Sequence, residues 1–362
     1  MCFSYCHSRN SIYQTMIIKA VNLYKTLLTY KEIYRFNSLN GKYQQQASSL
    51  IYELKLKEEL ADCSQLPANY LLKIQWYMAE FMYVCRQFNT LDGNAPTKQQ
   101  ERTYLLAGIL IALCDLMVDD MNISQNSLAL YVNPVSQKLK PVNSLEKIYL
   151  EIFQQFKDSV DLRFWPYVDA YYAALFNAQI VSKQQLRAET TVDQADSICR
   201  DKCGYNMLFL RALAEGKIDK KEQTAWYEFG AFVQFCNDAQ DMHKDLNQGI
   251  QTFATTRATL FHIIDDLEAQ RQVAFHSILQ LTYPKQKLYN FLFAAHLMAA
   301  IIYAKLNVYK QLCNGHFTKE KFSNINKATV RQACSPAKLT PYALPKILKF
   351  SYRNIAAPLV SY

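Results

Sequence analysis

The sequence predicts an all-α protein built as a single large helical domain. Half of its 362 residues are hydrophobic, which is ample material for a buried core. Gly occurs 8 times and Pro 10 times, which is few for this length. Apolar residues recur at the three- and four-residue spacing of helices, whereas the sustained apolar/polar alternation typical of strands is hard to find.

Helices can be assigned in order along the chain from this spacing. The first, residues 11–35, carries Tyr13, Met16, Leu23 and Leu27 on one face. The other expected helices are residues 42–62, 68–88, 104–120, 144–157, 165–186, 195–215 and a stretch within 229–256. Two connections are expected, a loop at 89–99 that contains Gly, Asn and Pro, and a long polar segment at 122–144. We divide the domain into N-terminal helices (1–98), core helices (99–260) and C-terminal helices (261–362).

The cysteines and the N-terminus indicate a cytoplasmic protein. Ten cysteines are spread without a CxxC pair, and Cys114 and Cys236 lie in apolar helical stretches, where cysteine behaves as a small hydrophobic residue. The first ten residues lack the long apolar segment of a secretory signal. The longest apolar run, 288–304, contains Asn290 and His296 and is expected to be a buried helix rather than a membrane span.

The net charge of +9 suits an anionic partner. Basic residues are dispersed along the sequence, and no zinc-finger, RNP or helix-turn-helix pattern is found, so we expect no nucleic-acid partner. A small phosphorylated substrate would use the charge equally well. The sequence leaves open both surface association with a membrane and a homodimer.

Acidic residues interrupt the apolar helix at 104–120. Asp115 and Asp119 are four residues apart, so their side chains lie one above the other and can share a cation, and Asp120 adjoins them. Such pairs are common on solvated helix faces. Here the surroundings are almost wholly apolar, and buried unpaired acids are costly, so a bound cation is the simpler explanation.

A second polar row follows at Asn237, Asp241 and Asp245, which are spaced i, i+4 and i+8. Gln234 and Asp238 belong to the same stretch, and phenylalanines surround it. Mg²⁺ commonly takes one or two carboxylates together with substrate phosphate oxygens. Two such rows facing each other would bind a diphosphate through metal ions.

The block FGAFVQFCNDAQDMHKDLNQGIQT at 229–252 resembles the second aspartate-rich segment of class I isoprenoid synthases. Asn237-Asp238 and Asp241 match its DDxxD motif with Asn in first place. Asn237, Asp241 and Asp245 also match the spacing of the terpene cyclase metal-binding triad. The resemblance covers roughly residues 100 to 260.

What the resemblance implies is a helical bundle of the class I terpenoid synthase type with a central cavity. It further implies Mg²⁺, with three ions bound together with a prenyl diphosphate substrate. A second segment, RDKCGYNMLFLRALAEG at 200–216, is similar to the helix that contacts diphosphate in these enzymes. The similarity implies that Lys202 contacts the diphosphate. Gln234, in the 229–252 block, is a second catalytic candidate. Further diphosphate-binding candidates are Arg200, Lys244 and Arg353. The aromatic residues expected to line the cavity, where ring faces would stabilise a carbocation, are Tyr205, Phe209, Phe232 and Phe235.

Two departures from the prenyltransferase pattern favour a terpene synthase. Ile123 stands where the first DDxxD needs an acid, so Asp115 and Asp119 form a DxxxD arrangement instead, and no GGKxxRP segment precedes it. Head-to-tail or head-to-head prenyl coupling is the alternative activity. A third alternative is a non-catalytic helical scaffold or regulatory subunit. The acidic stretch 261–270 is interpreted as an exposed face.

Overall fold

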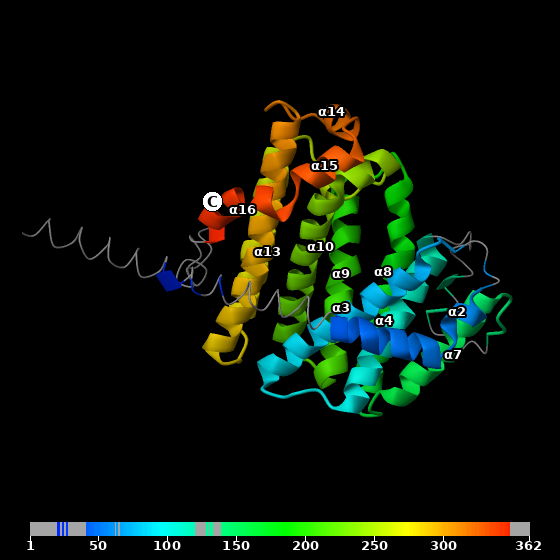
Figure 1. Ribbon diagram of the computed structural model, residues 1–362. Coiled ribbons are helices and arrows are strands. Elements are labelled where there is room, and N and C mark those ends of the chain that lie inside the picture. Colours follow the sequence, from blue (N-terminus) through cyan, green and yellow to red (C-terminus); the bar gives the residue numbers. More distant parts are fainter. Residues whose placement is uncertain are drawn as a thin grey trace, which may run out of the picture.

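A computed structural model describes residues 41–61, 63, 66–119, 139–347 and the isolated positions 20, 21, 24, 27, 128, 129, 131 and 132 (Figure 1). Throughout this part of the chain the secondary structure is helical and no strand is found. The predicted all-α class is therefore confirmed. The helical bundle of the terpenoid synthase type, its central cavity and the three-segment division remain predictions.

Residues 41–53 are helical and are followed by a series of helices. These are α2 (Leu56–Glu59), α3 (Tyr70–Asp92), α4 (Lys98–Asp119), α7 (Ser144–Ser159), α8 (Trp165–Ser182), η1 (Lys183–Leu186), α9 (Val192–Glu215), α10 (Lys220–Gln248), α11 (Phe253–Thr256), α12 (Leu260–Leu279), α13 (Lys285–Leu312), α14 (Lys319–Ser323), α15 (Lys327–Ala333) and α16 (Pro336–Ile347). The expected helix at 11–35 lies almost wholly outside the described residues.

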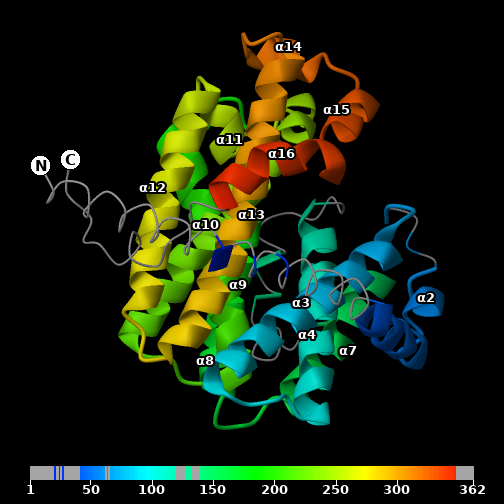
Figure 2. The same ribbon diagram turned by 60° about the vertical axis from the view of Figure 1, so that its left-hand side comes forward.

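Helices α9 and α10 form the centre of the molecule. α9 packs against α3, α8 and α10, while the other side of α10 contacts α12 and α13. Figure 1 shows α8, α9, α10 and α13 running side by side, with α3 lying obliquely to them, and Figure 2 shows α12 next to α10. α4 packs on α3 and α7, so both helices predicted to carry acids belong to the core.

The central helices approach closely at glycines. A Cβ on Gly230 of α10 would lie 2.2 Å from the carbonyl oxygen of Cys203 on α9. A Cβ on Gly108 of α4 would lie 2.6 Å from the Cα of Met78 on α3. Side chains at these positions would force the helices apart, so both glycines fix how near the neighbouring backbones lie.

One predicted boundary is wrong. The expected helix at 68–88 continues to Asp92, and α4 already begins at Lys98, so the loop expected at 89–99 is confined to the residues between these helices. Asn89 is buried and its side-chain oxygen accepts a hydrogen bond from the Tyr104 hydroxyl at 2.9 Å. This tertiary contact holds the last turn of α3, which ends at Gly93 with φ 89°.

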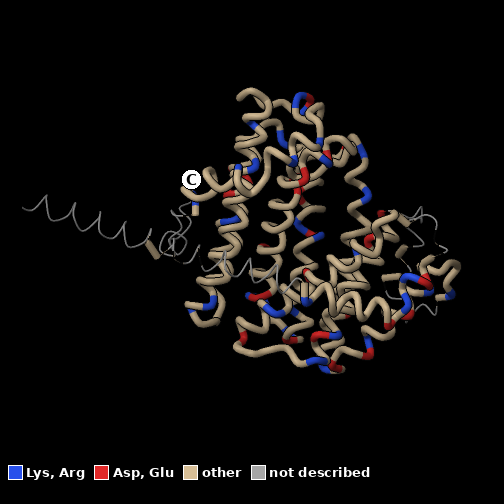
Figure 3. Tube along the Cα trace, in the orientation of Figure 1, with Lys and Arg blue, Asp and Glu red and all other residues tan. Residues whose placement is uncertain are grey.

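α13 contains the apolar run at 288–304. By length and composition it is long and apolar enough to cross a membrane, alone among the described helices, yet 67% of its most apolar stretch is buried by other parts of the protein. It contacts α3, α10, α12, α15 and α16. This burial agrees with the expected packed helix, while cytoplasmic location remains a prediction. In Figure 3, Lys and Arg are spread over many of the described helices.

Candidate functional site

Lys202 of α9 acts electrostatically on groups of both α4 and α10. α9 begins with a capping box in which Thr191 and Gln194 satisfy each other's backbone N–H groups, which fixes the start of the helix. Burial raises the pKa of the Cys114 thiol on α4, and the nearby Lys202 ammonium opposes that shift. Lys202 also lowers the pKa of Asp238 and Asp245 on α10, against larger effects that raise it. One ammonium group is thus within electrostatic reach of both helices.

Asp115 is not the unpaired acid that the sequence suggested. It is 8% exposed, and its two carboxylate oxygens are held separately. The Lys73 ammonium of α3 lies 2.7 Å from Oδ2, and the Gln179 amide of α8 donates to Oδ1 at 2.6 Å. The expectation that Asp115 is an unpaired acid is therefore wrong, because Lys73 and Gln179 compensate its charge, and its metal role stays a prediction.

The rest of the first row is more open. Asp119, one turn along α4 from Asp115, is exposed, and Asp120 lies outside the described residues. Burial and then Asp115 raise the pKa of the Tyr77 phenol well above its usual range, and Asp119 adds to the effect. Asp115 and Asp119 thus act on the same phenol of α3, which agrees with their sharing one face of α4.

Asp238 connects three helices from a fully buried position. Its Oδ1 accepts a hydrogen bond from Gln234 at 2.8 Å, and its Oδ2 accepts from the Cys199 thiol at 2.9 Å and from the backbone N–H of Phe253 at 3.2 Å. Burial raises the pKa of Asp238. The carboxylate is directed toward α9 and the start of α11, and Gln234 acts here by orienting it. The predicted metal role of Asp238 and catalytic role of Gln234 remain untested.

The triad of the second row has a graded exposure along α10. Asn237 is exposed, Asp241 is partly exposed with its Oδ2 3.9 Å from the Lys244 ammonium, and Asp245 is only 5% exposed. Burial, followed by the charge of Asp238, raises the pKa of Asp245 to about 7, and Asp241 adds to the effect. Asp245 is a carboxylate that a cation would stabilise.

The additional basic candidates are placed differently from Lys202. Arg200 is two residues away on α9, which is about 200° around the helix, and pairs with both carboxylate oxygens of Glu228 at 2.8 Å. It also donates to Gln270 of α12. Lys244 is exposed and Arg353 lies outside the described residues. Among the basic candidates that the structure describes, Lys202 acts electrostatically both on Cys114, next to Asp115, and on Asp238 and Asp245.

The aromatic residues predicted to line a cavity all make ring contacts. Tyr205 packs edge-on against Tyr227, and Phe235 stacks on Phe253 with centroids 4.0 Å apart. Phe209 and Phe232 are fully buried. Their ring partners are Phe81, Phe156 and Tyr172 for Phe209, and Phe229 and Phe275 for Phe232. These contacts are those of a packed core and leave the cavity-lining role a prediction.

The fit to Mg²⁺ differs between the two rows. Among the described residues, no group of three or more His, Cys, Asp or Glu side chains is arranged to hold a metal ion. In the second row, Asn237, Asp241 and Asp245 offer oxygen donors on one helix face, and Asp245 is 5% exposed. These donors fit a hard, oxygen-preferring cation. In the first row, Asp115 would first have to separate from Lys73.

Sequence reasoning missed the polar face of α3. Lys73, Tyr77 and Glu80 are spaced i, i+4 and i+7 and therefore share one face, a signal that was present in the sequence. Glu80 keeps solvent-exposed surface, yet the surrounding protein desolvates its carboxyl and raises its pKa. Asn206 of α9 was also missed.

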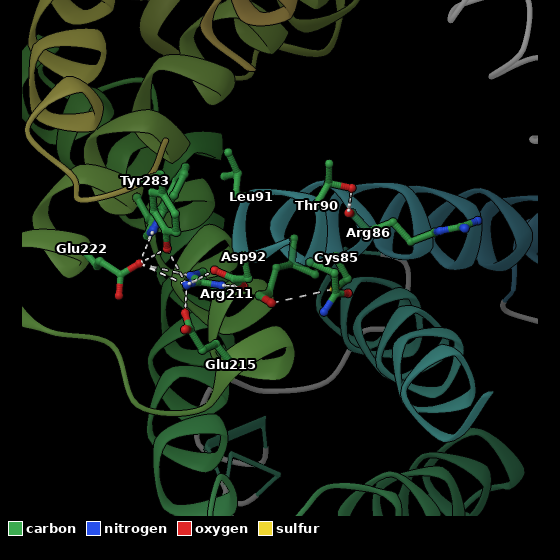
Figure 4. Close-up of polar contacts among 12 residues, drawn as sticks. Cys85, Arg86, Thr90, Leu91, Asp92, Arg211, Glu215, Glu222 and Tyr283 are labelled. Atoms are coloured by element: carbon green, nitrogen blue, oxygen red, sulfur yellow. Dashed lines mark hydrogen bonds and ion pairs between the residues drawn. The ribbon is translucent and has the colours of Figure 1, made fainter. Parts of the chain in front are cut away.

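A separate charged cluster joins the other ends of these helices. Arg211 of α9 is 1% exposed and contacts Asp92 of α3 at 2.7 Å, Glu215 on its own helix and Glu222 of α10 at 3.2 Å. It also contacts the Tyr283 hydroxyl, and Figure 4 shows these groups converging on one guanidinium. Because protein groups contact the Arg211 guanidinium from several helices, the role of this cluster is to hold α3, α9 and α10 together.

Comparison with known proteins provides no relative. No protein-family model, curated protein or solved structure matches this chain.

Proposed function

We propose that this protein is a Mg²⁺-dependent class I isoprenoid synthase that ionises a prenyl diphosphate, and specifically a terpene synthase. The observation that carries the proposal is Asp245, which is 5% exposed and whose pKa is raised to about 7 by burial and by the charge of Asp238. It lies one turn beyond Asp241 on α10 and within electrostatic reach of Lys202. A diphosphate with its cations would add positive charge near Asp245 and would supply negative charge that Lys202 can bind.

In this proposal some residues bind the metal and others bind the leaving group. Asn237, Asp241 and Asp245 would hold Mg²⁺, which when bound supplies Lewis-acid stabilisation of the departing pyrophosphate. Lys202 would donate to the diphosphate oxygens. Gln234 keeps Asp238 in place, and through it the N-terminal end of α11.

The contacts of Asp115 favour a second candidate function, a helical scaffold. Its ion pair with Lys73 and its hydrogen bond from Gln179 would also suit a helical scaffold that binds no metal at the first row. If the protein is a terpene synthase, two arrangements of the first row are possible. Either Asp115 separates from Lys73 when substrate binds, or the exposed Asp119 binds the metal instead of Asp115. The two functions therefore differ in whether metal and diphosphate bind together.

The site is tested by removing single charges from the second row. Asp241→Asn and Asp245→Asn should each lower Mg²⁺-dependent pyrophosphate release at least about 100-fold, because each removes a metal-ligand charge. Asp265→Asn on α12 is the matched control, since Asp265 is an exposed helical acid. It should keep wild-type activity. Equal activity in all three variants would overturn the assignment of the second row.

Ligand binding gives a readout that is independent of turnover. Pyrophosphate with Mg²⁺ should raise the melting temperature clearly, and either one alone should raise it little, because only together do they balance the charges of the site. The shift should disappear in Asp245→Asn. No shift in the wild-type protein would favour the scaffold.

A further inference from the structure

The last described helices lie together at one end of the molecule. α16 packs along α13, α15 also contacts α13, and α14 contacts α10. Figures 1 and 2 both show α14 and α15 at the upper end of α13, with α16 beside α13. Residues 305–347, which comprise α14, α15, α16 and the last two turns of α13, are called the C-terminal segment below.

Acidic residues are almost missing from the C-terminal segment. It contains eight of the 40 Lys and Arg but one of the 31 Asp and Glu, Glu320, which leaves 32 basic and 30 acidic residues for the rest of the chain. The segment therefore carries +7 of the net charge of +9. Six of its basic residues are exposed, namely Lys310, Lys321, Lys327, Arg331, Lys338 and Lys346. A surface with charge of one sign attracts a partner of the opposite sign.

α16 combines this charge with an exposed aromatic ring. One row of its residues is buried against the protein and consists of Leu339, Ala343 and Ile347. A second row with the same spacing, Lys338, Tyr342 and Lys346, is exposed. A tyrosine between two lysines suits the headgroup region of a bilayer, because its ring is apolar, its hydroxyl is polar and the lysines can contact phosphates.

The C-terminal segment meets α10 on both sides of Asp241. The Lys305 ammonium donates to the side-chain oxygen of Gln240 at 2.7 Å, and the carbonyl oxygen of Ile325 accepts from the His243 ring at 2.8 Å. Gln240 directly precedes Asp241, and His243 follows it by two residues. The basic surface therefore lies at the part of α10 that carries the second polar row.

We propose that the C-terminal segment docks the protein on a membrane surface that contains anionic lipids. A bilayer presents negative charge over an extended plane, which suits basic residues distributed over several helices. The sequence contains no nucleic-acid-binding motif, and the exposed Tyr342 fits a lipid interface, so lipid is the partner that these observations favour. Docking does not depend on the proposed isoprenoid chemistry. One consequence rests on that function, namely that the second row would lie near a bilayer in which a prenyl chain dissolves.

The test is co-sedimentation of the purified protein with vesicles, without Mg²⁺ or substrate. The vesicles consist of phosphatidylcholine alone or of phosphatidylcholine mixed with phosphatidylserine. Each basic residue near an anionic surface strengthens binding about fivefold, so the mixed vesicles should bind at least about 100-fold more tightly. Binding should weaken as NaCl is raised from about 0.1 M to about 1 M, because the screening length shortens. Equal binding to both kinds of vesicle, or no binding to either, would overturn the proposal.

Variants locate the surface that binds. Three exposed lysines of the segment are neutralised together in Lys321→Gln, Lys327→Gln, Lys338→Gln, which should weaken binding to the mixed vesicles about 100-fold. Lys346 is kept because its ammonium lies 4.4 Å from the centroid of the Tyr303 ring and helps to hold α16 on α13. The substituted side chains are exposed, so the melting temperature should stay at the wild-type value.

The matched control removes the same charge elsewhere, in Lys217→Gln, Lys220→Gln, Lys221→Gln. These lysines are also exposed, but they lie at or before the start of α10, about 30 Å along the helix from Gln240. Their neighbours in sequence include the acids Glu215, Asp219 and Glu222. The control should bind like the wild-type protein. An equal loss in both triple variants would show attraction by net charge alone and would overturn the assignment of the C-terminal segment.

Nucleic acid is the competing partner. Fluorescence anisotropy with a single-stranded RNA and a duplex DNA, at the same salt concentration, should show weaker binding than that to the mixed vesicles. Tight binding of either nucleic acid together with weak vesicle binding would overturn the membrane proposal. The vesicle assay uses no substrate, so vesicle binding without pyrophosphate release would overturn the proposed isoprenoid synthase and leave the docking surface standing.

Discussion

Replacing Arg211 by Met should destabilise the protein more than any single surface charge change. The methionine keeps the aliphatic volume but removes a guanidinium that is 1% exposed. Its partners Asp92 and Glu222 are themselves 12% and 16% exposed, so both carboxylates would remain largely buried without their cation. Glu215, at 46% exposed, can turn to solvent.

The magnitude follows from this burial. Removing one partner of a buried ion pair typically costs about 3–5 kcal/mol, so we expect a loss of about 4 kcal/mol in the free energy of unfolding. For a chain of 362 residues that corresponds to a melting temperature lower by about 5 °C. The guanidinium also lies over the rings of Phe88 and Tyr283, at 5.7 and 5.6 Å from their centroids, and these contacts are lost as well.

The assay is urea unfolding followed by far-UV circular dichroism, with Arg102→Met as the matched control. Arg102 pairs with Glu53 on the surface, where both side chains are well exposed, so its loss should cost no more than about 1 kcal/mol. Adding Glu222→Gln to Arg211→Met should recover part of the stability, because it removes a largely buried charge that has lost its cation. Equal stability of the two arginine variants would refute the reasoning.

Three further predictions concern pH, helix packing and the leaving group. Burial lowers the pKa of His296 from 6.5 to about 4, so its contribution to stability should be complete above pH 6.5 and be lost, up to about 3 kcal/mol, as the pH falls toward 4. Unfolding curves of His296→Gln should lack this part of the pH dependence, and an unchanged dependence would contradict the prediction. Gly230→Ala should cost about 1–3 kcal/mol because its Cβ would meet the Cys203 carbonyl, whereas Gly41→Ala, with nothing within 4 Å, should stabilise by up to about 1 kcal/mol. Thermal melts that rank these two the other way would refute the packing argument. Lys202→Met should lower pyrophosphate release at least about 100-fold with helicity unchanged, and near-normal release would remove Lys202 from the site.

The spacing of apolar residues predicted most of the helices, because buried positions on a helix recur every three or four residues. Residues 144–157 and 195–215 were assigned close to the observed α7 and α9, whose caps at Asn143 and Thr191 were present in the sequence. The end of α3 was missed because it depends on Asn89 and Tyr104, which meet only in the folded protein. A polar residue such as Asn89, followed closely by a Gly and a Pro, is typical of a loop in the sequence. Only its contact with Tyr104 shows that it belongs to the helix.

The residues of the candidate site could be predicted from the sequence better than the side chains with which they interact. The i, i+4, i+8 spacing placed Asn237, Asp241 and Asp245 on one helix, and the structure keeps them there. The partners of Asp115 were not predictable, because Lys73 and Gln179 come from helices distant in sequence. An apolar sequence around an acid shows that the acid is buried, and only the fold shows what compensates its charge.

Glu80 illustrates the opposite case. Its helix is amphipathic, and an acid in such a helix is ordinarily a solvated surface residue. The spacing of Lys73, Tyr77 and Glu80 shows that they share a face, but the desolvation that raises the pKa of Glu80 depends on the fold and has no local sequence signal.

The central claim is that the protein ionises a prenyl diphosphate, and pyrophosphate release tests it most directly. Purified protein should be incubated with Mg²⁺ and C10 to C25 prenyl diphosphates, each with and without isopentenyl diphosphate, and both pyrophosphate and organic products measured. We predict Mg²⁺-dependent release from one allylic substrate alone. Release that requires isopentenyl diphosphate would indicate prenyl coupling instead, and no release from any substrate would contradict the account and favour a helical scaffold.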